Sequence, residues 1–90
     1  MPQLPASITV ASNVTSEVIT VTNYSVYSSI VWYCNGEDGT VSTTNGEFTL
    51  NITAAPFNGN EGIYYLTVTG ITTAGSMPYS TQIPIEVEAL

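Results

Sequence analysis

The sequence predicts an all-β domain, a two-sheet antiparallel sandwich of about seven short strands. Three observations lead to this fold class. The chain is rich in Val, Ile, Thr and Tyr, which favour pleated, half-buried surfaces. Apolar and polar residues alternate in short segments, with turn residues about every 8–12 positions. No segment has the period of a helix. A five-stranded barrel is the alternative, and it fits the number of strands less well.

The length suits one domain. We expect a single domain that spans all 90 residues. A chain of this size buries only roughly 60–65% of its unfolded surface, so modest stability is expected. No apolar run approaches the roughly 18 residues that a membrane helix needs. No positively charged start precedes an apolar stretch, so no secretory signal is predicted.

The first two strands are expected at Ser7–Ala11 and Ser16–Thr22, after an extended lead-in that contains Pro2 and Pro5. Apolar and polar residues alternate in both segments, so one face of each strand is expected to be buried. A turn at Ser12-Asn13 separates the two strands. The residues expected to point inward are Ile8, Val10, Ile19 and Val21.

The third strand is expected at Ile30–Cys34, after a loop at Asn23–Ser29. It contains the only tryptophan and the only cysteine of the chain. A small β domain is expected to pack its core around Trp32, its largest apolar side chain. Alternation predicts that Ile30, Trp32 and Cys34 point inward, whereas Val31 and Tyr33 point outward.

Turn residues interrupt the middle of the chain. Asn35-Gly36-Glu37-Asp38-Gly39 predicts a tight connection, because Asn-Gly and Asp-Gly readily supply positive φ. A short strand at Thr40–Thr43 and a turn at Thr44-Asn45-Gly46 are expected to follow. The next strand is expected at Glu47–Thr53, with Phe48, Leu50 and Ile52 pointing inward.

Two further strands are expected after a loop at Ala54–Glu61. They lie at Gly62–Thr69 and at Tyr79–Glu88, with a loop at Gly70–Pro78 between them. Pro84 lacks a backbone N–H, so the last strand is predicted to be partly an edge there. The residues expected to point inward are Tyr64, Leu66, Val68, Ile83, Ile85 and Val87; Ile63, Tyr65 and Thr67 are expected to point outward.

The charge balance argues against several functions. The chain has seven acidic residues, no Lys, Arg or His, and a formal net charge of −7. Nucleic-acid binding needs cations that replace phosphate counterions, so it is not expected, and anionic membranes would repel the chain. Without His or Lys, the chain has no ordinary general base near neutral pH and no Ser–His or Cys–His pair. We therefore expect no enzymatic activity and no membrane insertion.

Neither a cofactor nor a metal is expected. One cysteine and no histidine cannot form a transition-metal site. Hard oxygen ligands occur in two turns, but without the spacing of a calcium loop, so ordinary turn chemistry is the preferred interpretation. Those residues are Asn35, Glu37 and Asp38, and then Asn58, Asn60 and Glu61. Cys34 is expected to be an inert, inward-facing thiol.

Three motifs resemble those of immunoglobulin-like domains, closest to the intermediate set. Val31-Trp32-Tyr33-Cys34-Asn35-Gly36-Glu37 resembles the third-strand pattern hydrophobic-Trp-Tyr-x-Asn-Gly. Phe48-Thr49-Leu50-Asn51-Ile52 is similar to the alternating Leu-x-Ile of the fifth strand. Asn60-Glu61-Gly62-Ile63-Tyr64-Tyr65-Leu66 resembles Asp-x-Gly-x-Tyr-x-Cys of the sixth. The resemblance runs from about Ile8 to Val87.

The resemblance implies roles for four core residues. Val21 and Leu66 stand where the family has its two core cysteines, and both would pack against Trp32. The spacings, 32 − 21 = 11 and 66 − 32 = 34, lie in the family's usual range. Tyr64 would be the tyrosine-corner residue, whose hydroxyl returns to the backbone. An apolar contact would replace a disulfide that typically contributes about 2–4 kcal/mol.

The resemblance also implies a candidate docking face. In an immunoglobulin-like topology the third and sixth strands are neighbours, so Tyr33 and Tyr65 would form an outward cross-strand pair. Val31 and Ile63 extend this apolar patch on an otherwise acidic surface. Such a patch is typical of a docking site, although the same aromatic residues also stabilise a sheet by themselves.

Cysteine-free relatives are common in bacterial surface proteins and on tailed-phage virions. The resemblance therefore implies a structural or binding module, first of all a phage virion accessory domain on the capsid or tail that mediates weak adhesion or virion stabilisation. The Met start without a signal and the small size of the chain agree with this expectation. One alternative is a bacterial cell-surface or adhesin module cut from a longer protein. Another is a subunit of an extracellular filament that assembles through its first or last strand. The expected partner is a protein of the capsid, tail or cell surface, or a carbohydrate, at the virion surface or otherwise outside cells.

Overall fold

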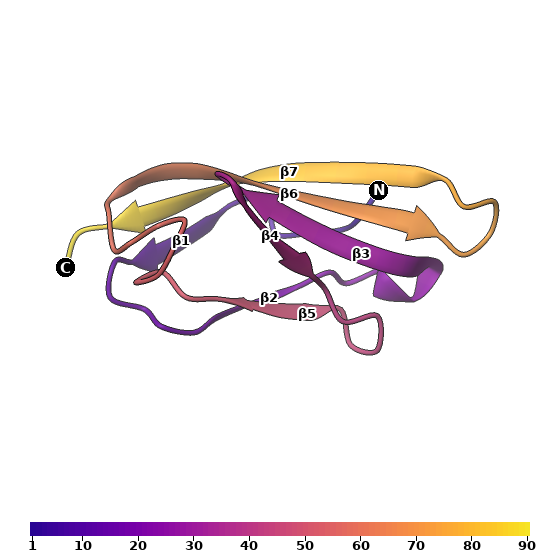
Figure 1. Cartoon of the computed structure of the whole chain (residues 1–90), viewed down its shortest axis with the longest axis horizontal. Coiled ribbons are helices and arrows are strands. Elements are labelled where there is room, and N and C mark those ends of the chain that lie inside the picture. Colours follow the sequence, from indigo (N-terminus) through magenta and orange to yellow (C-terminus); the bar gives the residue numbers. More distant parts are fainter.

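Two β-sheets face each other across one apolar core in the computed structural model, which describes residues 1–90 (Figure 1). The predicted all-β class is confirmed, since the structure contains seven strands and no α-helix. The larger sheet has the order β1-β7-β6-β3-β4, and β2 pairs with β5 in the smaller one. The strands are β1 (Ile8–Ala11), β2 (Glu17–Thr20), β3 (Tyr27–Cys34), β4 (Glu37–Thr40), β5 (Glu47–Leu50), β6 (Gly62–Thr72) and β7 (Pro78–Glu88).

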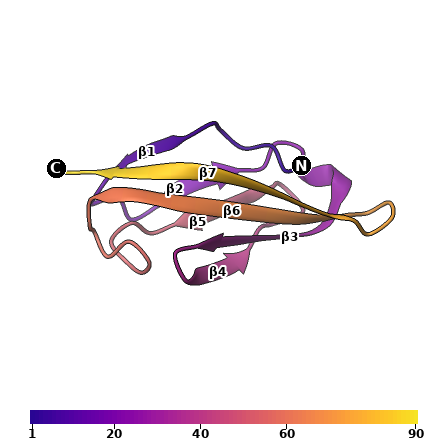
Figure 2. The same ribbon diagram turned by 90° about the horizontal axis from the view of Figure 1, so that it is seen from above.

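One strand pairing is parallel. β1 runs alongside β7 in the same direction, from Ile8 opposite Ile85 to Ala11 opposite Glu88. The prediction of an antiparallel sandwich is correct for the other four pairings and wrong for this one. Side-chain alternation specifies the face that a residue occupies, whereas it carries no information on strand direction. Figure 2 shows β1 on one side of the β6–β7 pair and β3 with β4 on the other.

The N-terminal lead-in connects the two sheets. The backbone N–H of Thr22, just after β2, donates to the carbonyl oxygen of Gln3 at 3.1 Å. The side-chain oxygen of Asn23 accepts from the backbone N–H of Gln3 at 2.8 Å. On the other side, the Thr81 hydroxyl of β7 donates to the carbonyl oxygen of Pro2. The chain therefore begins between the sheets and then joins the larger one as β1.

A two-residue turn joins β3 to β4. Asn35 and Gly36 have φ values of 46° and 93°, and Cys34 lies opposite Glu37. Positive φ at both central residues is the geometry of a type I′ hairpin, which matches the twist of the strands. The predicted connection as far as Gly39 and the predicted strand at Thr40–Thr43 are therefore wrong. Asp and Gly are poor strand formers, and pairing with β3 overrides that preference.

Several further boundaries differ from the prediction: β2 ends at Thr20 rather than Thr22, and β5 ends at Leu50 rather than Thr53. β3 begins at Tyr27 rather than at Ile30, and β6 continues to Thr72 rather than ending at Thr69. The Tyr27 ring is buried and covers Gly70 of β6, where an added Cβ would lie 2.5 Å from Tyr27 Cδ1. A side chain at that position would therefore exclude the ring. Only a short 3-10 helix, Tyr24–Val26, remains of the expected loop.

The core lies between the sheets. Its members follow the predicted alternation closely on β3, β5, β6 and β7. Phe57, which belongs to the loop before β6, adds a fully buried ring to it. The smaller sheet supplies only two strands, so this loop covers apolar surface that the strands leave open. The buried apolar residues are Val10, Ile19, Val21, Tyr27, Ile30, Cys34, Val41, Phe48, Leu50, Ile52, Phe57, Leu66, Val68, Ile83, Ile85 and Val87.

Candidate functional site

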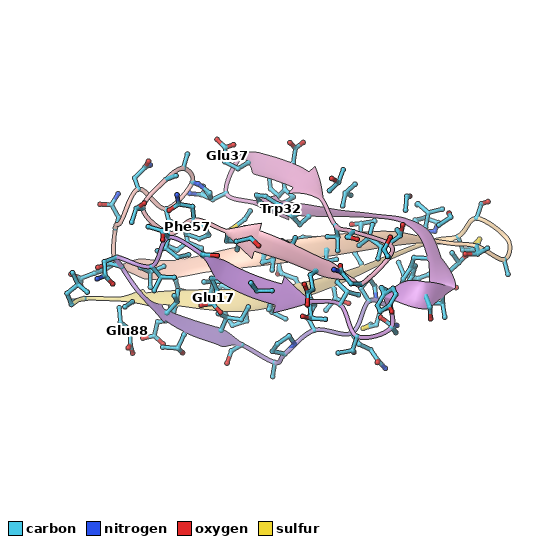
Figure 3. All side chains as sticks on the ribbon, turned by 90° about the horizontal axis from the view of Figure 1, so that it is seen from below. Glu17, Trp32, Glu37, Phe57 and Glu88 are labelled. Carbon is cyan, nitrogen blue, oxygen red and sulfur yellow. The ribbon has the colours of Figure 1, made fainter.

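Val21 and Leu66 are both fully buried in the core, whereas Trp32 is only half-buried. The Trp32 ring, labelled in Figure 3, stacks on Phe48 of the opposite sheet. The ring centroids are 5.9 Å apart and the planes meet at 16°. The ring lies at the margin of the core because β3 is next to the edge strand β4. On that edge strand, Gly39 lies opposite Trp32. The expectation that the core is built around Trp32 therefore needs correction: this ring closes the side of the sandwich.

Tyr64 connects the loop before β6 to the strand. Its hydroxyl donates to the carbonyl oxygen of Asn60 at 3.1 Å, and the carbonyl oxygen of Phe57 lies 3.5 Å away. Its ring meets Phe57 edge-on, with centroids 4.8 Å apart and planes at 74°. Tyr64 therefore orients the loop that carries Phe57 into the core, and its hydroxyl returns to the backbone four residues earlier in the chain.

The four candidate docking residues lie on the outer face of the larger sheet. They occupy β3 and β6, and their neighbours along each strand point into the core. The exposed fractions are 46% for Val31, 54% for Tyr33, 61% for Ile63 and 57% for Tyr65. We call these four residues the tyrosine face. Because the outer side of the larger sheet is bare, no other element of the chain covers them.

The strand register offsets the two tyrosines by two residues along β6. Tyr33 lies opposite Thr67, whereas Tyr65 lies opposite Pro84. Tyr33 and Tyr65 are therefore diagonal neighbours on adjacent strands and do not lie directly opposite each other. Diagonal positions on adjacent strands are about 7–8 Å apart, within reach of two aromatic rings. Both tyrosines line one open hollow of about 400 Å³, together with Ile63, Asn35, Tyr64 and Gln82.

Neutral polar side chains surround the tyrosine face along β6 and β7. The hydroxyls of Thr69 and Ser80 share a hydrogen bond of 2.8 Å across these strands. The Gln82 amide donates to the Thr67 hydroxyl at 3.4 Å. These groups therefore have hydrogen-bond partners within the chain, on the same sheet as the aromatic rings.

Carboxylates stand at both lateral margins of the tyrosine face. Asp38 of β4 lies opposite Tyr33, and Glu86 of β7 lies opposite Ile63. Sequence reasoning missed Asp38 as a neighbour of Tyr33, because it assigned Asp38 to a turn. The Asn35-Gly36 dipeptide contained the needed signal, since a two-residue hairpin fixes the register of the residues that follow it.

The remaining chemical groups form no second site. No group of three or more His, Cys, Asp or Glu is arranged to hold a metal ion. Burial raises the pKa of the Cys34 thiol to about 11. Glu86 and Glu88 are exposed on the strand. No helix of the structure is long and apolar enough to cross a membrane.

Comparison with known proteins assigns the chain to no group: no protein family matches the sequence, and no curated protein matches it. The arrangement of the residues is therefore the basis for a functional assignment. Its one unusual feature is the tyrosine face, an exposed aromatic and apolar area with carboxylates at its margins.

Proposed function

We propose that this chain is a non-catalytic, immunoglobulin-like binding module that docks through the tyrosine face. The observation that carries the proposal is the exposure of Tyr33, Tyr65, Val31 and Ile63 together on one bare sheet face. Tyrosine supplies large contact area with little loss of conformational freedom, and it is enriched where proteins bind partners. Tyr33 and Tyr65 are each more than half exposed, so most of each side chain is accessible to a partner.

The strand order supports the immunoglobulin-like part of the proposal. In that fold the third, sixth and seventh strands form one sheet, and variable-type domains add a strand beside the third. The order β7-β6-β3-β4 agrees with this pattern, and β2 with β5 corresponds to the pairing in the opposite sheet. The Tyr64 hydroxyl bond to the Asn60 carbonyl agrees with a tyrosine corner. Val21 and Leu66, both buried, would occupy the two cysteine positions.

The setting that we propose is the surface of a tailed-phage virion, as a capsid decoration or tail-appended domain. There the module would mediate weak adhesion or add to virion stability. The core without a disulfide supports this setting through its resemblance to the cysteine-free relatives found there. A bacterial surface or adhesin module is the alternative with the same fold and the same docking face.

A filament subunit would instead need a free strand edge. β1 is an edge of the larger sheet, whereas β7 lies between β1 and β6 over Ile85–Val87. Earlier in β7, the lead-in bonds to Thr81. The free edge of β1 could therefore pair with a strand of another subunit. β7 has much less free edge for such pairing.

Immunogold electron microscopy separates these settings. An antibody raised against the purified chain is applied to virions and cells of the source organism. Label on capsids or tails is the result we expect. Label confined to the cell envelope would replace the phage setting by the bacterial one, and fibres formed by the purified chain would favour the filament.

Substitution of the tyrosines tests the docking face in either setting. The chain with Tyr33→Ala and Tyr65→Ala is compared with wild type for binding to the labelled structure and to a glycan array. Tyr79→Ala is the matched control, because Tyr79 is also exposed, at 44%, but lies outside the tyrosine face. We expect the double variant to lose binding at least tenfold, as is typical when central aromatic residues of an interface are truncated. Undiminished binding by the double variant would rule out this face.

A further inference from the structure

We infer that the partner of the tyrosine face is a protein surface that presents Lys or Arg side chains around an apolar centre. This inference rests on the proposed docking function and adds the chemical class of what docks. It comes from the position of the carboxylates around the face, from the lack of any cationic side chain in the chain, and from the continuity of two hollows.

The carboxylates of this protein have no counter-ions of their own. The chain has seven acidic residues and no Lys, Arg or His, and its net charge is −7. In most proteins, cationic side chains are mixed among surface acids and weaken their field. Here no cationic side chain opposes the field of the acids, so a cationic partner is attracted within about one Debye length, about 8 Å at physiological salt.

The acids are also placed where a partner on the tyrosine face would meet them. Glu61, Glu86 and Glu88 line an open hollow of about 530 Å³ at the end of β6 and β7. Ile63 lines this hollow and also the one that contains Tyr33 and Tyr65. The two hollows therefore form one continuous surface, acidic at one end and aromatic at the other. Asp38 bounds the aromatic end on the opposite side.

This arrangement resembles half of a protein interface. Interfaces commonly have an apolar and aromatic centre with polar or charged groups at the margin. Marginal charges steer the encounter and select partners of opposite charge more than they add affinity. The tyrosine rings add a second preference, because a guanidinium or ammonium group is attracted to the face of an aromatic ring.

Two other occupants fit this surface less well. A second copy of the chain would bring its own charge of −7 against the same carboxylates, so like charges would oppose the contact. A neutral glycan would stack on the tyrosines but would leave the carboxylate-lined hollow without ionic partners. Both occupants make predictions that differ from those of a cationic protein, so the same experiment distinguishes them.

The test uses a defined cationic probe and nuclear magnetic resonance. The ¹⁵N-labelled chain is titrated with a peptide, blocked at both ends, in which arginine alternates with leucine. A twin peptide with glutamine in place of arginine controls for charge. We expect the arginine peptide to shift the amide signals of β3 and β6 around Tyr33, Ile63 and Tyr65, and to bind at least tenfold more tightly than its twin.

Charge variants locate the effect. Glu86→Gln with Glu88→Gln removes two carboxylates beside the tyrosine face. Glu17→Gln with Glu47→Gln removes two from the smaller sheet, so both variants have a net charge of −7 + 2 = −5. Figure 3 shows Glu17 and Glu88 on separate strands of the two sheets. We expect the first variant to weaken binding of the arginine peptide about threefold to tenfold, and the second to change it less than twofold.

Three results would overturn the inference. The first is equal affinity for the arginine and glutamine peptides, and the second is an equal loss of affinity in the two charge variants. The third is that amide signals next to acidic residues of both sheets shift alike. The natural interaction gives an independent measure: its affinity must fall when the salt concentration rises. If the tyrosine variants abolish that interaction while salt and Glu86→Gln leave it unchanged, the docking face stands and the cationic partner is refuted. A neutral glycan would give that pattern, whereas a second copy would bind more tightly at high salt, because salt screens the repulsion between two chains of net charge −7.

Discussion

The ring of Tyr64 contacts the ring of Phe57 edge-on, with 4.8 Å between their centroids, and the Phe57 side chain is fully buried. A loop residue thus completes the core beneath β6. Phe57→Ala is expected to lower the free energy of unfolding by about 3–5 kcal/mol, because it removes a buried ring and leaves a cavity. Urea denaturation followed by Trp32 fluorescence measures this change.

Tyr64→Phe isolates the hydroxyl from the ring. It keeps the edge-on contact and removes only the hydrogen bond to the Asn60 carbonyl, so a loss of about 1 kcal/mol is expected. A loss as large as that of Phe57→Ala would show that the hydroxyl, not the ring contact, holds the loop.

Gly39 is required by the Trp32 ring. An added Cβ at Gly39 would lie 2.5 Å from Trp32 Nε1 and 2.8 Å from Cε2, and a rigid indole cannot yield as a flexible chain can. Gly39→Ala is therefore expected to displace the ring toward solvent, shift its fluorescence to longer wavelength and cost about 1–3 kcal/mol. Thr40→Ala, next on the same edge strand, is the control and should leave the fluorescence unchanged. An unshifted spectrum in Gly39→Ala would contradict this geometry.

The Cys34 thiol links stability to alkaline pH. Burial raises its pKa from 9.0 to about 11, so between these pH values the folded chain keeps a proton that the unfolded chain has lost. The stabilisation is fully present below pH 9 and falls as the pH rises toward about 11. Because other groups titrate in the same range, the measurement is the difference in pH dependence between wild type and Cys34→Ala. Identical curves would contradict the buried thiol.

A new disulfide tests the immunoglobulin-like alignment. If Val21 and Leu66 occupy the two cysteine positions of the family, Val21→Cys with Leu66→Cys should form a bridge on oxidation. Cys34 lies opposite Leu66 on the adjacent strand, so the pair must be made together with Cys34→Ala. The oxidised protein is expected to be more stable than its reduced form by about 2–4 kcal/mol. Two free thiols in the folded, oxidised sample would argue against the alignment.

The sequence predicted the buried faces better than the connections between strands. Alternation correctly assigned Leu66 and Val68, or Ile83 and Ile85, to the core, because burial on one face of a strand requires a period of two. It could not reveal Phe57, since a loop has no period. The parallel direction of β1 was equally hidden, because side-chain alternation is the same whichever way a strand runs.

The sequence predicted which residues form the tyrosine face, but it did not predict the register in which β3 and β6 pair. Alternation alone placed Tyr33 and Tyr65 outside the core. Their diagonal offset depends on how β3 pairs with β6, where the register shifts between Tyr27 and Ser29. The register is set by contacts between strands far apart in the sequence, such as that of Tyr27 with Gly70, which alternation along one strand does not encode.

Hydroxyl-radical footprinting of the bound chain tests the docking face most directly. The chain is oxidised free and in its complex with the virion or cell surface proposed as its partner, and the oxidation of each tyrosine is measured by mass spectrometry. We expect Tyr33 and Tyr65 to be protected together from oxidation in the complex, while Tyr79 is oxidised equally in the free and bound chain. Protection of Tyr79 with continued oxidation of Tyr33 and Tyr65 would contradict it.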